Sequence, residues 1–330
     1  MILAGDVGGT KCNLAVYDQL PGALVERASR RFLSRDYARF DDVVRDFVDA
    51  VVKPGGFKVT AAGFGIAGPI RNNASVATNL PWEVRGSSLS ALLGIPRTSL
   101  VNDLEANAYG IRELTPQDFE TLNEGAPGAE GPQAVIAAGT GLGEAGLFWD
   151  GKTHRPFSSE GGHSDLAARN ETEDDLVVYL RKKFNGHVSA ERVLSGPGLK
   201  NIYDFLRDTG RGTEEPWLKE AMEKGDPAAA ISKAALEGSS PLVGQALDLF
   251  VTLYGSEAGN LALKLMATGG VFVGGGIAPK ILPRMRSPLF MEAFLSKGRL
   301  RPVLEQIPVR VILNDRTALL GAARCAVLGV

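Results

Sequence analysis

The chain has few of the residues that build metal centres and disulfide frameworks. Its 330 residues include only 2 cysteines and 3 histidines. Cys12 and Cys325 stand far apart and form no CxxC pair, so we expect neither a zinc knuckle nor a disulfide framework. Free thiols are typical of a reducing compartment. The sequence therefore favours a cytoplasmic protein.

Strong net charge and long apolar runs are also missing. The formal net charge is −2, and basic pairs such as Arg30-Arg31 are short, which is typical of solvated strand or helix ends. Charged residues interrupt the most apolar long stretch, 247–273, which predicts a buried helix followed by a strand. The first residues show no secretory signal. We therefore expect neither a nucleic-acid partner nor a membrane.

Glycine, in contrast, is abundant. The chain has 40 glycines, while its 44% hydrophobic and 22% charged residues are ordinary for a globular protein. The glycines gather in short motifs, which is typical of tight turns and of backbone that approaches a phosphate closely. With roughly 100–200 residues per domain, the length predicts two domains.

Apolar periodicity predicts alternating strands and helices, hence an α/β fold with mixed sheets. A second strand–turn–strand unit begins near residue 134, and residues 171–267 have mostly helical spacing. The strands expected in the first part are Ile2–Val7, Asn13–Tyr17, Leu24–Leu33, Ala61–Ala67 and Ser99–Asn102, and the helices are Phe40–Val52 and Leu104–Leu114. A last helix is expected at Thr317–Val327.

Three glycine motifs follow predicted buried strands. The first runs from Asp6 through Gly8, Gly9 and Thr10 to Lys11. Its amides could approach phosphate oxygens, Thr10 and Lys11 could add a hydroxyl and a charge, and Asp6 could hold magnesium directly or through water. A plain hairpin turn explains this motif equally well.

The second motif contains Gly139, Thr140 and Gly141, and the third is Gly274, Gly275 and Gly276. The second motif is not a Walker A motif, because no GK[ST] follows. It is also a poor dinucleotide-binding fingerprint, because a strand rather than a helix is expected after Gly143. Packing alone poorly explains such turns after three buried strands.

Two further motifs carry groups suited to a polyhydroxylated acceptor. Asn102-Asp103 ends a strand and precedes a helix, so Asp103 could take a proton from an attacking hydroxyl or could simply cap the helix. Glu160 and His163 flank a Gly-Gly turn and could point into one cavity, although a loop histidine satisfied by backbone is an equal alternative.

The three glycine motifs resemble the phosphate-1, phosphate-2 and adenosine motifs of the sugar kinase–actin–heat-shock ATPase superfamily. From residue 2 to about residue 326 the chain resembles the bacterial glucokinases of the type without zinc. The likeness is densest at Gly65–Pro69, Ala77–Trp82, Val101–Gly110, Gly139–Gly143, Ser159–Asp165, Ser189–Leu199 and Asn314–Ala323.

This resemblance implies a ribonuclease H-like, actin-like ATPase fold of two α/β domains around a cleft. The expected parts are a small domain, 1–112, a large domain, 113–312, and a C-terminal helix, 313–330, that returns to the small domain. It also implies a homodimer.

The resemblance further implies an enzyme that uses ATP and Mg²⁺ to phosphorylate the 6-hydroxyl of glucose. Asp103 would be the base and would also bind the sugar. In zinc-containing relatives the histidine that matches His163 serves a zinc site built with cysteines, which this chain lacks, so His163 is expected to contact the sugar. The other expected sugar-binding residues are Asn79, Asn102, Glu160 and Glu191.

Other functions stay open at this point. The same fold could phosphorylate mannose, fructose or an amino sugar instead. A sugar-sensing repressor would need an N-terminal helix-turn-helix, for which a nucleotide hairpin beginning at residue 2 leaves no expected room. An actin-like filament protein would not need the sugar-binding set.

Overall fold

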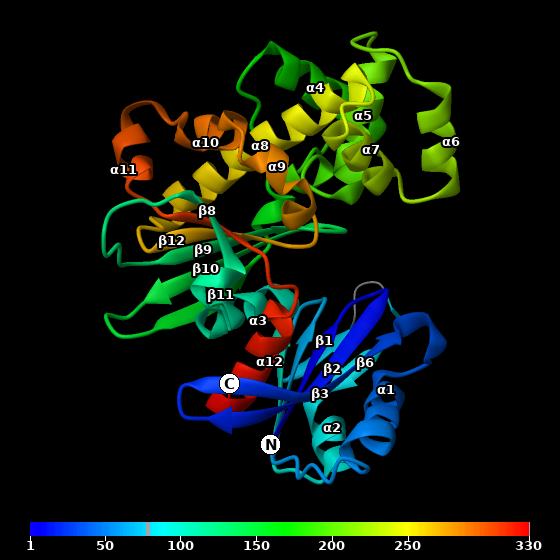
Figure 1. Ribbon diagram of the computed structural model, residues 1–330, viewed down its shortest axis with the longest axis vertical. Helices are drawn as coiled ribbons and strands as arrows, with labels where there is room; N and C mark the ends of the chain where they lie inside the picture. The colour runs from blue at the N-terminus through cyan, green and yellow to red at the C-terminus, as the bar shows by residue number, and fades with distance from the viewer. Residues whose placement is uncertain (77–79, 330) are drawn as a thin grey trace. The chain divides into compact units, whose positions relative to one another are not determined.

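The computed structural model describes residues 1–76 and 80–329, and the chain separates into two compact units (Figure 1). Unit 1 comprises Met1–Asp118, Arg155–Ser158 and Asn314–Val330, and unit 2 comprises Phe119–His154 and Ser159–Leu313. Among the described residues, no helix is both long and apolar enough to cross a membrane.

Unit 1 is built on a five-stranded mixed sheet, as predicted. Its strands are arranged in the order β3-β2-β1-β4-β7, where β1 to β3 form antiparallel pairs and β4 and β7 run parallel to β1. The strands are β1 (Ile2–Val7), β2 (Lys11–Leu20), β3 (Ala23–Leu33), β4 (Ala61–Ile66) and β7 (Thr98–Asn102). A separate two-stranded sheet joins β5 (Ala74–Val76) and β6 (Glu83–Arg85).

The two faces of this sheet have different cores because side chains alternate along each strand. Leu3, Val7 and Leu14 lie in one cluster, together with Phe40 and Leu89 from the helices on that face. These helices are α1 (Phe40–Phe47), which continues as a π-helical turn at Val48–Val52, and α2 (Gly86–Leu93). The predicted helix over 40–52 is thus confirmed, although it changes from α-helical to π-helical hydrogen bonding after Phe47. Helix α2 was not predicted.

The other face is covered by α12 (Thr317–Leu328), which packs on β1, β4 and α3 (Asp103–Gly110) (Figure 1). Small residues permit this close packing. A Cβ at Gly321 would lie 1.7 Å from the carbonyl oxygen of Ala106, and one at Gly63 would lie 2.1 Å from that of Ala322. The chain's last helix therefore belongs to the same core as its first strand.

Unit 2 repeats the same pairing scheme. In its six-stranded sheet, of order β11-β10-β9-β12-β13-β8, an antiparallel β9–β10 hairpin is again followed by a parallel neighbour, β12. The strands are β8 (Phe119–Asn123), β9 (Gln133–Ala138), β10 (Leu142–Trp149), β11 (His154–Ser159), β12 (Gly270–Gly274) and β13 (Val309–Ile312).

Helices form most of the remainder of unit 2; those within 171–267 confirm the helical spacing there, whereas the three short helices between 282 and 305 were not predicted. The longest, α8 (Pro241–Leu265), is buried over most of its length and precedes β12. The others are α4 (Glu171–Lys183), α5 (Gly196–Asp208), α6 (Pro216–Lys224), α7 (Pro227–Leu236), α9 (Leu282–Met285), α10 (Pro288–Leu295) and α11 (Arg301–Glu305).

The close approach of α12 to α3 generates the first testable prediction. Gly321→Ala would drive a methyl group into the Ala106 carbonyl and should destabilise the protein by about 1–3 kcal/mol, the usual penalty for overpacking a core. Gly244→Ala in α8 is the control, because a Cβ there meets nothing within 4 Å. This variant should be more stable than the wild type by about 0.5–1 kcal/mol, since alanine favours a helix over glycine. Chemical denaturation would measure both, and equal effects would contradict the packing argument.

Candidate active site

The turn between β1 and β2 is held in shape by a residue that sequence reasoning missed. Gly8 N donates to the Lys11 carbonyl at 3.0 Å, and buried Ser34 braces the turn from outside. The Ser34 hydroxyl donates to Gly8 O at 2.8 Å and its amide donates to Thr10 O at 3.0 Å. Thr10 and Lys11 remain exposed. A fixed turn with an exposed hydroxyl and ammonium is suited to an anionic ligand.

Asp6 ends the same strand and is half-buried. Asn13 on β2 donates its side-chain amide to Asp6 Oδ2 at 3.2 Å. Burial raises the pKa of Asp6, and the nearby Asp315 charge acts in the same direction, while the Asn13 hydrogen bond and the Lys11 charge oppose it. The site therefore contains a carboxylate whose charge a cation would stabilise.

Asp103 lies on the same face of the sheet as Asp6, separated from it by Gly65. Asp6 and Gly65 are neighbours in register, and a Cβ at Gly65 would meet Ala106 Cβ at 2.8 Å and Asp103 Cα at 3.8 Å. The absence of a side chain at Gly65 lets the start of α3 approach the sheet. Gly65 thus lets the Asp103 end of α3 lie next to the strand register that carries Asp6.

The alternative that Asp103 is a helix N-cap is wrong in detail, because Asn102 holds that position. Asn102 Oδ1 accepts from Leu104 N at 2.9 Å and its Nδ2 donates to Gly68 O at 3.2 Å. Asp103 is the first residue of α3, with Oδ1 3.0 Å from Leu104 N. Asn79, the remaining predicted sugar-binding residue of this part, lies outside the described residues.

In unit 2 the β9–β10 turn is bound directly to the segment that carries Glu191. Gly139 O accepts from Gly196 N at 2.8 Å, and the Glu191 carboxylate accepts from Leu142 N at 3.0 Å. A Cβ at Gly141 would lie 2.4 Å from Glu191 Oε2. Glu191 lies in a single 3₁₀ turn, Ala190–Arg192.

The Glu160–His163 turn lies directly on β10. A Cβ at Gly162 would come within 2.1 Å of Leu142 O, and one at Gly161 within 2.0 Å of Glu144 Oε2. The two glycines are therefore required by packing. Exposed His163 lies with Nδ1 3.9 Å from Glu191 Oε1, so these two predicted residues do come together.

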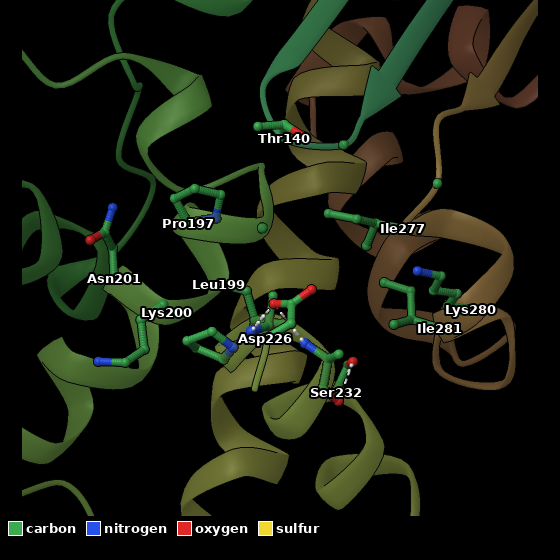
Figure 2. Close-up of a pocket in the computed structure, with 16 residues that line it drawn as sticks. Thr140, Pro197, Leu199, Lys200, Asn201, Asp226, Ser232, Ile277, Lys280 and Ile281 are labelled. Carbon is green, nitrogen blue, oxygen red and sulfur yellow. Dashed lines mark hydrogen bonds between the residues drawn. The ribbon is translucent and has the colours of Figure 1, made fainter. Parts of the chain in front are cut away.

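A pocket of about 670 Å³ opens beside the β9–β10 turn, within the usual size range for a small-molecule site (Figure 2). Of the predicted nucleotide-binding residues of unit 2, Gly139, Thr140 and Gly276 line it. Gly275 has a φ of +82° and packs against Ala138 O instead, where a Cβ would lie at 2.2 Å. Gly274 ends buried strand β12.

The rest of the lining comes from helix starts that sequence reasoning did not assign. Figure 2 shows Asp226 and Ser232 across the pocket from Thr140. Asp226 caps α7 by accepting from Ala228 N at 2.9 Å. Lys200 and Asn201 on one side and Ile277, Lys280 and Ile281 on the other complete the view. The Ser-Gly-Pro-Gly start of α5 is a cap signal that could have indicated this wall.

The hydroxyl of Tyr254, on α8, explains how the strand ends beside the pocket are held. Fully buried Tyr254 accepts from Ala138 N at 3.1 Å, and its oxygen lies 3.3 Å from the carbonyl oxygens of Ile136 and Gly274. One side chain thus satisfies the ends of both β9 and β12, the two strands that precede the glycine turns.

Glu144 lies beneath the Glu160–His163 turn and is 1% exposed. Burial, followed by the charge of Glu257, raises its pKa to about 7, and Lys264 opposes the shift. Within the described residues Glu144 Oε1 has no hydrogen-bond partner. The native state therefore prefers this carboxyl neutral.

Replacing Glu144 should change how stability depends on pH. The contribution of Glu144 to wild-type stability should fall as pH rises from about 4.5 to about 7, by roughly 3 kcal/mol, because the folded protein resists ionisation of this group. Glu144→Gln should abolish that fall and so gain stability relative to the wild type at pH 8 but not at pH 4.5. Denaturation across pH measures it, with exposed Glu292→Gln as the control; parallel curves for the wild type and Glu144→Gln would contradict the assignment.

Known proteins resemble this chain along its whole length. The family model described as Glucokinase matches residues 3–328. A glucokinase of Nostoc sp. strain PCC 7120 is 44% identical over 99% of this chain and 98% of its own length. A glucokinase of Synechocystis sp. strain PCC 6803 is 40% identical over 98% of this chain and 97% of its own.

Solved structures agree with these relatives. The glucokinase of an Antarctic psychrotroph superposes with a TM-score of 0.85 at 31% identity, covering 99% of this chain and 98% of its own. The ROK family glucokinase of Streptomyces griseus, solved with glucose and AMPPNP, has a TM-score of 0.67 at 21% identity, with 99% of each chain covered, which is a likeness of fold alone. The predicted actin-like ATPase fold is confirmed. Because the family model and the full-length relatives agree, this chain belongs to the glucokinase family.

Proposed function

We propose that the chain transfers the γ-phosphoryl group of ATP to the 6-hydroxyl of glucose, giving glucose 6-phosphate and ADP. Membership of the glucokinase family makes it an ATP-dependent hexose kinase. The observation that carries the proposal is the full-length match to glucokinases, and it is supported by the glycine turns that follow β1 and β9 of this chain. The protein is proposed to act in the cytoplasm as a homodimer.

The nucleotide is proposed to bind through backbone amides and through the pocket. The turns at Gly8–Lys11 and Gly139–Gly141, with Gly274, Gly275 and Gly276, would contact the phosphates. The 670 Å³ pocket beside Thr140 would receive the adenosine. This proposal is supported by the apolar Ile277 and Ile281 and the polar Asn201 and Asp226 in its lining, since nucleoside sites combine apolar walls with a few polar groups.

Magnesium is proposed to bind at Asp6, directly or through water. The described residues contain no group of three or more His, Cys, Asp or Glu that could hold a metal. That agrees with Mg²⁺, which usually takes one or two protein carboxylates and completes its shell with phosphate oxygens and water. When bound, the ion would neutralise charge on the transferred phosphoryl group.

The sugar is proposed to bind through Asn102 and Asp103 of unit 1 and Glu160, His163 and Glu191 of unit 2, with Asn79 as a further ligand. Carboxylates accept hydrogen bonds from vicinal hydroxyls, and imidazole can donate or accept. Asp103 is proposed to take the proton of the 6-hydroxyl as the phosphoryl group moves in line. Exclusion of water would be left to closure around the substrates.

The base is tested by Asp103→Asn. The variant should lose about 10²–10⁴-fold in kcat, the usual contribution of a general base, while its affinity for ADP stays at the wild-type value. A coupled assay of ADP release across glucose, mannose, fructose and N-acetylated amino sugars would measure the rate. If the wild type prefers another sugar, the assignment of glucose as the substrate is wrong. If Asp103→Asn is fully active, the assignment of Asp103 as the base is wrong.

Glu191 should affect the binding of both substrates, because its carboxylate accepts a hydrogen bond from Leu142 N in the β9–β10 turn and lies beside His163. Glu191→Ala should raise KM for glucose about 10–100-fold, because a hydrogen bond to a charged group contributes about 1.5–3 kcal/mol. It should also raise KM for ATP, since the turn loses its anchor. Steady-state kinetics with each substrate varied would check this, and Glu191→Gln, which keeps an acceptor oxygen, should behave more mildly. An unchanged KM for ATP would refute the anchor.

A further inference from the structure

A row of polar side chains crosses three adjacent strands of unit 1 and ends at Asp6. Asp6 on β1 stands opposite Asn13 on β2, and Asn13 stands opposite Arg31 on β3. Asn13 Nδ2 donates to Asp6 Oδ2 at 3.2 Å, and Arg31 Nε donates to Asn13 Oδ1 at 3.0 Å. The three residues therefore form one directional chain of hydrogen bonds.

This chain determines which way the Asn13 amide points. A guanidinium has only donors, so it holds the carbonyl oxygen of Asn13, and the NH₂ group must then face Asp6. The flipped amide would turn an oxygen toward the Asp6 carboxylate and a donor toward the Arg31 donor, losing both hydrogen bonds. Arg31 thus fixes the donor that Asp6 receives, although it does not contact Asp6 through a hydrogen bond itself.

The neighbouring arginine has a different environment. Arg30 lies with its guanidinium carbon 5.2 Å from the centre of the Phe32 ring, and successive side chains of a strand point to opposite faces. Within residues 1–76 and 80–329, Arg31 makes no ion pair, and Asn13 is its hydrogen-bond partner. The short basic pair of the sequence therefore contains two residues with distinct surroundings, only one of which reaches toward the site.

We propose that Asn13 and Arg31 are positioning residues for phosphoryl transfer, which hold the Asp6 carboxylate in place to receive the magnesium of Mg-ATP. Lys11, on the adjoining turn, and Asp315, before α12, are the other charged groups that act on Asp6, and they oppose one another. The oriented amide of Asn13 is then the neutral contact that aims Asp6 Oδ2. The inference rests on the proposed role of Asp6.

Binding of the β,γ-imido analogue of ATP, with and without Mg²⁺, tests the inference without turnover. Asn13→Leu keeps the branched shape of the side chain and removes both hydrogen bonds. It should weaken Mg²⁺-supported binding about 10–100-fold, as loss of an outer-sphere partner usually does, and leave Mg²⁺-free binding unchanged. Arg31→Gln should weaken it in the same sense, about 10-fold, because a glutamine amide can present either a donor or an acceptor and no longer fixes the Asn13 amide. Arg31→Lys, which has only donors, should restore it. Arg30→Gln, which removes the same charge from the same strand, should match the wild type.

A double-mutant cycle separates action through Asn13 from action by charge alone. If Arg31 works through Asn13, then Arg31→Gln should have no further effect in the Asn13→Leu background, both on analogue binding and on kcat. Additive losses would overturn the proposal. So would equal weakening of binding with and without Mg²⁺ in Arg31→Gln, which would mean that the guanidinium contacts the phosphates directly.

Two controls test whether the variants fold and whether Asp6 itself supports the Mg²⁺ dependence. Arg31 is exposed, so Arg31→Gln should fold even if Asn13→Leu does not, and melting temperatures would verify this. Asp6→Asn would be measured alongside. If Asp6→Asn leaves the Mg²⁺ dependence intact, the assignment of Asp6 fails; if it abolishes that dependence while Asn13→Leu and Arg31→Gln match Arg30→Gln, only the present inference fails.

Discussion

Close approach of backbone to backbone is the constraint on which both units depend. A Cβ would lie 1.7 Å from a carbonyl oxygen at Gly321 and 2.1 Å at Gly162, separations that no side chain permits. In unit 1 this approach lets α12 and α3 lie against the sheet end that carries Asp6 and Asp103. In unit 2 it lets the Glu160–His163 turn rest on β10. The high glycine content of the chain is therefore a packing requirement as much as a matter of turns.

Hydrogen bonds from neighbouring residues fix the glycine turns before any ligand binds. Ser34 ties the first turn through the oxygens of Gly8 and Thr10, and Glu191 ties the second through Leu142 N. Tyr254 holds the strand ends that lead to the second and third turns. Amides held in this way lose little freedom when a phosphate arrives, and such preorganised donors are the most effective ones in catalysis.

Local patterns in the sequence predicted the strands that end in glycine and the helices with apolar periodicity. Strand β1 and helix α12 are confirmed almost to the residue, since an apolar run beside a glycine turn and a long small-residue helix are local signals. Helix α2 was missed, as were β8, β11 and β13. Strand β11 is largely exposed and β13 has only four residues, so neither carries a clear alternation.

The supporting residues of the site were missed for a different reason. Ser34, Asn13 and Glu144 act across strands, and which residues face each other depends on pairing register, which local spacing does not reveal. The predicted residues behaved unevenly for the same reason. His163 and Glu191 lie 3.9 Å apart although they are distant in sequence, and Gly141 and Gly275, whose roles as phosphate contacts stay predictions, also lie too close to protein atoms to carry a side chain.

The two hairpin turns differ in the groups that they can present to a nucleotide. The first turn carries Thr10 and Lys11 and adjoins Asp6, so it offers charged side chains to a ligand. The Gly139–Gly143 turn contains no ionisable residue and is oriented entirely by hydrogen bonds to its backbone. A magnesium ion usually takes one or two protein carboxylates together with phosphate oxygens and water, while a phosphate can be bound by amide donors alone. The asymmetry supports the proposal that magnesium binds at Asp6 in unit 1, where the Asn13 amide donates to one carboxylate oxygen.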